Sequence, residues 1–223
     1  MSDGLGGMSA RSRLRRLPEL GSYDREVIYS LLDATSVCHV GTIVDGLPMV
    51  LPSLHVRDGD TLLLHGSRSS RLLRSMLSLE GVCVSVTHVD GLIVARSSFN
   101  SSVAYRSVAV FGPASLVEGT AARQDALDKL IDGILPGRSG EVRASTASEL
   151  RRTTVLRVSI EEASAKISEG PPEDDDDDVA GDAWAGVLPQ RIVLEEPLPA
   201  PDGRVGRGEI PLPASVTDRR GAL

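Results

Sequence analysis

Residues 37–56 read VCHVGTIVDGLPMVLPSLHV, two apolar runs that meet at Asp45-Gly46. An Asp-Gly pair between apolar runs predicts a β-hairpin, because a type I′ turn needs positive φ at both central residues. The same pattern follows around Asp58-Gly59 and again around Asp90-Gly91, where residues 82–95 are expected to form a further hairpin. Three such signals within about fifty residues predict an antiparallel meander, hence a barrel or sandwich.

Helical spacing of apolar residues predicts three helices beside these strands, the first of them capped by Ser22. They span residues 23–34, 69–79 and 121–135. A long strand is expected over 103–117, bent at Gly112-Pro113, and a last strand over 153–160. The sequence therefore predicts a mainly β fold with flanking helices.

Charge and composition divide the 223 residues into a central domain and flanking segments. The chain has 31 acidic and 24 basic residues, and eight of the acidic ones lie between Ile167 and Gln190, where no basic residue occurs. The remainder carries 24 positive against 23 negative charges, so it is nearly neutral. We expect a flexible basic arm over 1–20, the barrel domain over 21–170, an acidic loop and docking segment over 171–195, and a disordered tail over 196–223.

Several kinds of partner and compartment are disfavoured by the composition. The neutral body and the aromatic content of 3% argue against nucleic-acid binding. Asp174–Asp178 is interpreted as a solvated loop, because five consecutive carboxylates lack the alternating ligand spacing of a calcium loop. No metal site is predicted, and Cys38 and Cys83 are expected to be buried free thiols. Without a secretory signal or an apolar run of about 20 residues, a cytoplasmic protein that does not bind membranes is expected.

The stretch Leu62–Arg74 combines an apolar strand, a turn of small hydroxyl residues and the first turns of a helix that carries arginines. A helix N-terminus presents unpaired backbone N–H groups and the positive end of the helix dipole. Serine hydroxyls and an arginine beside that end would complete a phosphate site. On the local pattern alone, a plain helix cap at Ser69 or Ser70 explains the same residues.

A second informative run, Ser102–Gly112, reads SVAYRSVAVFG. It resembles the Y-R-S-V-x-V-x-G strand of the flavin-binding split-barrel proteins related to pyridoxamine 5′-phosphate oxidase, and in particular the Nim-type nitroimidazole reductase branch. The histidine followed six residues later by a basic residue in that branch is matched by His65 and Arg71. The segments 48–54 and 150–161 are similar to two further strands of the family. The resemblance covers residues 24–168.

This resemblance implies a split β-barrel, antiparallel and Greek-key-like, that forms a homodimer with FMN at the interface. The implied contacts to FMN fall in three segments. Leu51, Pro52, Ser53 and Leu54 would offer backbone groups to the isoalloxazine edge, and His65 and Gly66 would lie beside the ribityl chain and ring. Ser67, Ser70 and Arg71 would hold the phosphate, while Arg106 and Ser107 would approach the ring from the partner subunit.

Two functions of different classes follow from the resemblance. The first is a flavin-dependent oxidoreductase that reduces a small electrophile such as a nitroaromatic, with His65 as the catalytic residue that orients the substrate or supplies a proton. The second is a binding, storage or sensor protein that holds flavin, a deazaflavin or haem, with His65 or His39 as an axial haem ligand. Arg68 and Arg74 are expected to face solvent in either case.

Overall fold

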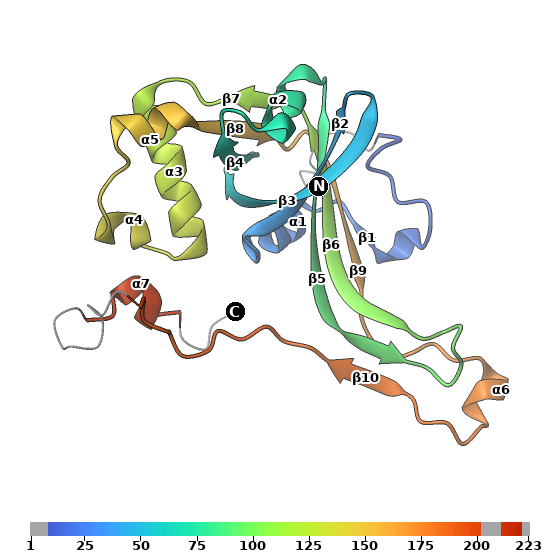
Figure 1. Cartoon of the computed structure of the whole chain (residues 1–223). Coiled ribbons are helices and arrows are strands. Elements are labelled where there is room, and N and C mark those ends of the chain that lie inside the picture. The colour runs from blue at the N-terminus through green and yellow to red at the C-terminus, as the bar shows by residue number, and fades with distance from the viewer. Residues whose placement is uncertain (1–8, 202–210, 220–223) are drawn as a thin grey trace.

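The computed structural model describes residues 9–201 and 211–219, and its main element is one antiparallel sheet (Figure 1). Hydrogen-bonded neighbours follow the order β1-β9-β6-β5-β2-β3-β4-β8-β7, and β10 pairs with β5. The strands are β1 Gly21–Ser22, β2 Val37–Val44, β3 Leu47–Asp58, β4 Thr61–Ser67, β5 Val82–Val94, β6 Ser102–Gly112, β7 Ala114–Leu116, β8 Thr153–Ser159, β9 Glu162–Ser168 and β10 Gly186–Pro189. The path from β1 to β7 is not closed, and the prediction of a mainly antiparallel β fold is confirmed.

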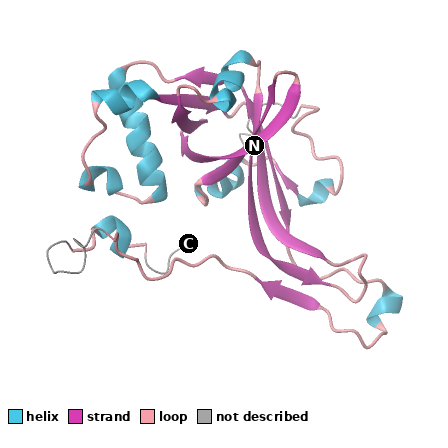
Figure 2. Cartoon of the chain, viewed as in Figure 1, coloured by secondary structure: helices cyan, strands magenta, loops and turns pink. Residues whose placement is uncertain are grey.

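The helices gather mostly at one end of the sheet, beside β4, β7 and β8 (Figure 2). They are α1 Arg25–Asp33, α2 Arg71–Ser78, α3 Thr120–Ile134, α4 Arg138–Glu141, α5 Ala147–Arg152, α6 Asp176–Val179 and α7 Ala214–Thr217, with a 3-10 turn at Pro18–Leu20. The three predicted helices are present as α1, α2 and α3. The predicted cap of α1 is wrong, since Asp24 rather than Ser22 accepts the backbone N–H groups of Glu26 and Val27.

Two of the predicted Asp-Gly hairpins are confirmed. Asp45 and Gly46 have φ of 51° and 78° and join β2 to β3, and Gly59 with φ of 61° lies between β3 and β4. The third is wrong, because β5 runs without a turn from Val82 to Val94 and has a register shift between Val89 and Gly91. Asp90-Gly91 is thus a bulge within one strand.

The bend at Gly112-Pro113 is confirmed, and it divides the predicted long strand into β6 and β7. β6 pairs with β5 and β9, whereas β7 pairs with β8. A Cβ at Gly112 would lie 1.9 Å from the carbonyl oxygen of Ser159, so the close approach of the two chains requires glycine there. β8 is not the last strand, because β9 and β10 follow it.

Two apolar clusters lie on opposite sides of β4, because successive strand residues point to opposite faces. Leu62 and Leu64 belong to the larger cluster, inside the barrel. Leu63 packs on the other side with Leu130 of α3 and Val155 of β8. All three leucines are buried, and each contributes about 1.5–3 kcal/mol of apolar transfer free energy. β4 is therefore a central strand between the barrel interior and α3.

The flanking segments contact the domain at defined points. Arg11 of the N-terminal arm pairs with Glu162, and Asp174 of the acidic loop pairs with Arg96 at 2.7 Å. Of the predicted tail, α7 bonds to Glu141 through Ser215. Residues 1–8, 202–210 and 220–223, on which part of the arm and tail predictions falls, lie outside the described residues. Within the described ranges, no helix has both the length and the apolarity to cross a membrane, and no group of three His, Cys, Asp or Glu side chains could hold a metal ion.

Candidate functional site

The sheet splits where the pairing between β3 and β4 ends. β3 pairs with β2 over Leu47–Leu54 and with β4 over His55–Asp58. Beyond the His55–Leu64 pair, β4 continues along β8, with His65 opposite Val155 and Ser67 opposite Thr153. One backbone edge of residues 47–54 consequently has no strand partner among the described residues. Such an edge can accept and donate hydrogen bonds to a ligand.

The turn after β4 brings three hydroxyl groups to the start of α2. The Ser67 hydroxyl lies 2.9 Å from that of Ser69, and the Ser70 N–H donates to the Ser67 carbonyl at 2.9 Å. Ser70 caps α2 by accepting the N–H of Leu73. In the part of the chain that the structure describes, the backbone N–H groups of Arg71 and Leu72 have no hydrogen-bond partner. An anion at this helix end would meet free donors.

Arg71 is the first residue of α2, and its side chain is exposed. It forms no ion pair with a described carboxylate, so its guanidinium can face a ligand at the same turn. Gly66 lies in β4 just before the turn. A Cβ at this position would lie 3.0 Å from Leu73 Cδ1 of α2. The absence of a side chain at Gly66 thus lets α2 lie close to β4.

His65 is half-buried at the strand end, next to this turn. Its Nδ1 is buried and has no hydrogen-bond partner in the described structure. Burial lowers the pKa of His65, so the ring is neutral at neutral pH. A neutral imidazole with an unused nitrogen can accept a proton, donate one or ligate a metal.

Leu54 lies on the same side of the sheet as His65. Val56 and Leu63 are register partners, and Leu54 and His65 each lie two residues beyond that pair. Ser53 and Leu51 therefore point to the other side, and Leu51 and Pro52 are exposed. Residues 51–54 lie on one side of the split, along β3, and His65 and the serine turn lie on the other side, along β4.

Arg106 and Ser107 lie elsewhere on this chain, on β6. Adjacent strand residues point to opposite faces, so Arg106 shares a face with His88 and Ser107 with Thr87. The Arg106 guanidinium makes a two-bond pair with Asp90 at 2.8 and 2.7 Å. This pair raises the pKa of Arg106 and lowers the pKa of Asp90. A role for these two residues at the flavin of a partner subunit remains a proposal.

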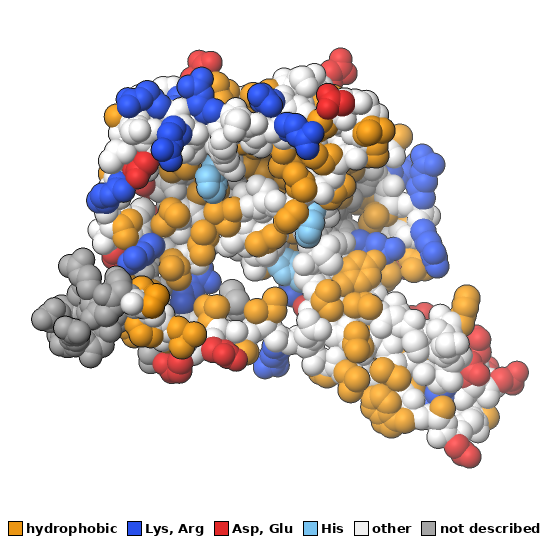
Figure 3. Space-filling model, viewed as in Figure 1, with side chains coloured by type: hydrophobic (Ala, Val, Ile, Leu, Met, Phe, Trp, Pro, Cys, Tyr) orange, Lys and Arg blue, Asp and Glu red, His pale blue; other side chains and the backbone are white. Residues whose placement is uncertain are grey.

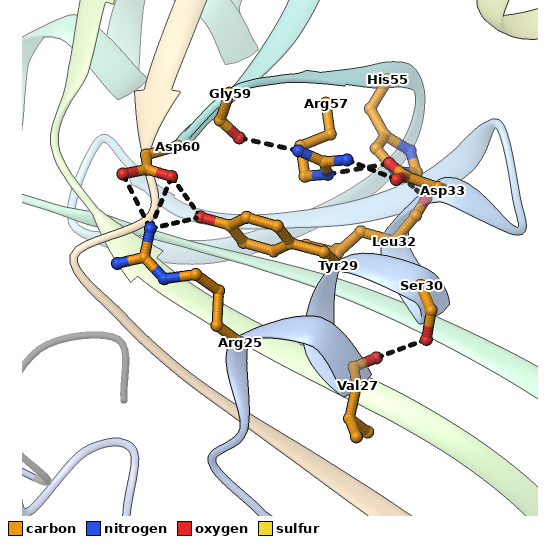
Figure 4. Close-up of polar contacts among 10 residues, drawn as sticks. All are labelled: Arg25, Val27, Tyr29, Ser30, Leu32, Asp33, His55, Arg57, Gly59 and Asp60. Atoms are coloured by element: carbon orange, nitrogen blue, oxygen red, sulfur yellow. Dashed lines mark hydrogen bonds and ion pairs between the residues drawn. The ribbon is translucent and has the colours of Figure 1, made fainter. Parts of the chain in front are cut away.

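A polar cluster that the sequence analysis missed fixes α1 against the β3–β4 hairpin (Figure 4). The Tyr29 hydroxyl donates to Asp60, which also pairs with Arg25 at 3.0 Å. Arg57 stacks 4.3 Å from the centre of the Tyr29 ring and pairs with Asp33. Burial, together with the bond to Asp60, raises the pKa of Tyr29 to about 12.

The neighbouring His55 is buried, and its Nε2 lies 3.1 Å from the Leu32 carbonyl at the end of α1. Alternation along β3 turns His55 and Arg57 toward α1, while Leu54 and Val56 pack on the opposite side against the apolar cluster of Leu63. The cluster therefore positions the last paired residues before the split. No local motif marks it, because its members are far apart in the sequence.

Arg68 is exposed, as predicted. It lines a pocket together with residues of β7, α3, α5 and β8, namely Leu116, Arg123, Arg151, Thr153 and Thr154. Arg74 is exposed, as predicted. The pocket adjoins the serine turn, because Thr153 and Thr154 lie opposite Ser67 and Gly66.

An antiparallel sheet that splits beside the N-terminus of a helix is the feature that defines the class of split-barrel proteins. Residues 24–167 match the family model described as pyridoxamine 5′-phosphate oxidase, and this chain belongs to that family. The predicted family and split-barrel fold are confirmed. No curated protein matches the chain.

Solved structures extend the likeness almost to the full chain. The flavocytochrome Anf3 from Azotobacter vinelandii is 36% identical, with a TM-score of 0.89 over 95% of this chain and 97% of that one. The FAD and haem binding protein from Mycobacterium smegmatis is 42% identical, with a TM-score of 0.84 over 90% and 97%. A protein described as a 5-nitroimidazole antibiotic resistance protein from Bacteroides thetaiotaomicron is 20% identical over 66% and 86%, with a TM-score of 0.57. That third likeness concerns the fold alone.

Proposed function

We propose that this chain is a redox protein that binds a flavin nucleotide and haem and passes electrons between them. The observation that carries the proposal is the split beside α2, which presents unpartnered N–H groups, serine hydroxyls and Arg71 to a phosphate. The two relatives at 36% and 42% identity are a flavocytochrome and an FAD and haem binding protein, which supports two cofactors rather than one.

The flavin would lie along the split, with its phosphate at Ser67, Ser70 and Arg71. The open edge of Leu51–Leu54 would bond the polar rim of the ring, and His65 would lie beside it. When bound, flavin supplies two-electron and one-electron transfer and haem supplies one-electron transfer. Protein donors near the ring stabilise the negative charge of the reduced form. FMN was the flavin expected from the sequence, and FAD is the alternative that the second relative supports.

Two of the four histidines fit a haem ligand better than the others. His55 and His88 use Nε2 on the carbonyls of Leu32 and Leu31, at 3.1 and 2.9 Å. His39 is exposed on the outer face of β2, between the exposed apolar residues Val37 and Ile43. An imidazole on an apolar strand face suits a porphyrin once a second surface covers it. In Figure 3, histidine and apolar side chains lie next to one another on the surface above the gap between the barrel and the C-terminal segment.

A partner subunit would supply that second surface, so the protein is proposed to act as a homodimer. Several apolar side chains of the β2–β3 ribbon are exposed in the single chain, among them Leu47 at 70% and Val50 at 64%. A twofold axis against this ribbon would bury them and complete the flavin slot with residues of β6 such as Arg106 and Ser107.

Reduction of a small electrophile at the flavin is the second candidate function. The feature that favours it is His65, a neutral imidazole with an unused nitrogen beside the proposed ring position. It would orient a nitroaromatic or hand it a proton. A reductase needs no haem, so the cofactor content separates the two functions.

The deciding experiment is the absorption spectrum of the purified full-length chain. Flavin bands together with a Soret band support the two-cofactor protein, and flavin bands alone support the reductase. His39→Ala and His65→Ala, with His88→Ala as the control, then assign the haem ligand through the position of the Soret band. A chain that binds neither cofactor after reconstitution contradicts both functions.

A further inference from the structure

Residues 191–196 read RIVLEE and follow β10 without belonging to a helix or strand. The side chains of Ile192 and Val193 are 71% and 69% exposed, and that of Leu194 is 45% exposed. A solvated tail is normally poor in apolar residues, and a run of three exposed aliphatic side chains is unfavourable unless it has a function. These six residues, called the strap below, therefore have the composition of a segment that packs on another surface.

The backbone of the strap is unpaired as well. No backbone N–H or carbonyl of residues 191–196 has a backbone hydrogen-bond partner among the described residues, whereas the Gln190 N–H just before the strap donates to the Asp90 carbonyl at 2.8 Å. Pro189 and Pro197 bound the strap, and no proline interrupts it. An extended segment with free donors and acceptors can add main-chain hydrogen bonds to a surface that it covers.

The chain is anchored to its own domain on both sides of the strap. Before the strap, β10 pairs with β5. After it, the Ser215 N–H of α7 donates to Glu141 of α4 at 3.0 Å. Figure 1 shows the C-terminal segment running from β10 along one side of the domain toward α7, and Figure 3 shows a gap between this segment and the barrel. A surface that covers the inner side of the strap must therefore enter this gap.

The β2–β3 ribbon has a matching apolar face. Val50 lies opposite Gly41, and Val37 and Ile43 lie on the same face because they are two or four residues from Gly41 along β2. All three side chains are exposed. In the single chain the strap and this face are both uncovered, so neither covers the other. Under a twofold axis, the strap of each subunit can cover the ribbon of the other, and the two contacts are identical.

The length of the strap suits this contact. Six extended residues span about 20 Å, and neighbouring strands lie about 5 Å apart, so the strap can cross both strands of the ribbon. A second copy is also the occupant that the proposed function already requires, because the exposed ribbon was assigned to the interface of a homodimer.

We propose that the strap of each subunit packs across the exposed face of the β2–β3 ribbon of the second copy. The inference rests on the proposed homodimer and adds the segment that clasps its subunits together. Ile192 and Val193 supply the apolar contact, and the unpaired backbone supplies hydrogen bonds. The same face of the ribbon carries His39, so the strap would lie beside a haem that His39 ligates.

A cross-linking experiment on the full-length chain identifies the surface that the strap contacts. The photoreactive residue p-benzoylphenylalanine replaces Val193, and the irradiated protein is separated on a denaturing gel. We expect a covalent dimer whose cross-linked peptide contains residues 37–50 of the second subunit. A cross-link confined to one chain, a cross-link to another surface of the second subunit, or no cross-link would overturn the inference.

Sedimentation measures the contribution of the strap to association. Ile192→Asp/Val193→Asp should raise the dimer dissociation constant about tenfold or more, because it places two charges in an apolar contact. Leu198→Asp is the control, since Leu198 is exposed and lies beyond Pro197, outside the strap. All three positions are exposed in the single chain, so circular dichroism should show an unchanged fold.

A double variant that associates as tightly as the wild type would overturn the inference and leave the homodimer standing. The same holds if Leu198→Asp weakens association as much as the double variant does. A wild type that stays monomeric at every concentration would overturn the proposed homodimer together with the inference.

Discussion

Ser67 on β4 lies directly opposite Thr153 on β8. The serine turn, which follows Ser67, is therefore next to the pocket that Arg68 and Thr153 line. Strand pairing fixes this relationship, since β4 and β8 stay in register over seven residues from Thr61 to Ser67. Any change that shifts β8 along β4 would therefore displace Thr153 and Thr154 of the pocket relative to the serine turn.

Arg71→Glu should abolish flavin retention, because it reverses the charge at the proposed phosphate site. Glutamate in the first turn of a helix is stabilising by about 0.3–1 kcal/mol, so α2 itself should stay folded. The flavin-to-protein ratio after gel filtration is the measurement. Arg74→Glu on the same helix is the control and should keep its flavin. A yellow Arg71→Glu protein with unchanged stoichiometry would refute the phosphate assignment.

Gly66→Ala should weaken flavin binding by pushing α2 away from β4. The new Cβ would lie 3.0 Å from Leu73 Cδ1, whereas a Cβ at the strand residue Gly41 would keep an ordinary distance of 3.7 Å from its nearest neighbour. Overpacking of this kind costs about 1–3 kcal/mol. Thermal unfolding and flavin titration of Gly66→Ala and Gly41→Ala provide the comparison, and equal behaviour of the two would exclude the effect.

Acidification should destabilise the protein before its carboxylates titrate. Burial lowers the pKa values of His55 and His65 in the folded state. Below the unfolded value of about 6.5, the unfolded chain binds protons that the folded chain does not, so stability falls as pH falls. The slope is at most about 1.4 kcal/mol per pH unit for each histidine.

Urea unfolding between pH 7 and pH 5 measures this slope. His65→Phe should flatten it, because the variant lacks the buried imidazole. A slope in His65→Phe as steep as in the wild type would assign the pH dependence to His55 or to other groups.

Tyr29→Phe should cost about 1 kcal/mol of stability, because it removes the hydroxyl that donates to Asp60. Arg25 would still pair with that carboxylate, and the Arg57 stack on the ring would remain. A double-mutant cycle with Asp60→Asn measures the coupling between the two residues. Additive effects would show that the bond contributes nothing to stability.

Local patterns predicted the parts of the fold that local chemistry determines. Asp45-Gly46 forms the expected turn because its backbone conformation depends on those two residues. Asp90-Gly91 has the same letters but forms a bulge, because Asp90 binds Arg106 and the chain at Leu188 packs on Gly91. A local sequence pattern cannot predict these contacts, because the residues that form them are far apart in the sequence.

The candidate site also has a part that local sequence predicts and a part that depends on tertiary packing. His65, the serine turn and Arg71 are contiguous, so the sequence could predict them as one unit. Arg123 and Arg151 join Arg68 only through the packing of α3 and α5 against β8. Their spacing along the chain carries no periodic signal, and the same is true of the cluster of Tyr29, Asp60 and Arg57.

β10 pairs with the far part of β5, and a Cβ at Gly91 would lie only 2.6 Å from the Leu188 carbonyl oxygen. Any side chain at position 91 would thus clash with the backbone of β10. The pairing of β10 with β5 runs from Gly186–Val94 to Pro189–Gly91, and the Gln190 N–H donates to the Asp90 carbonyl directly after it. A single methyl group at residue 91 would therefore push the start of the C-terminal segment away from β5.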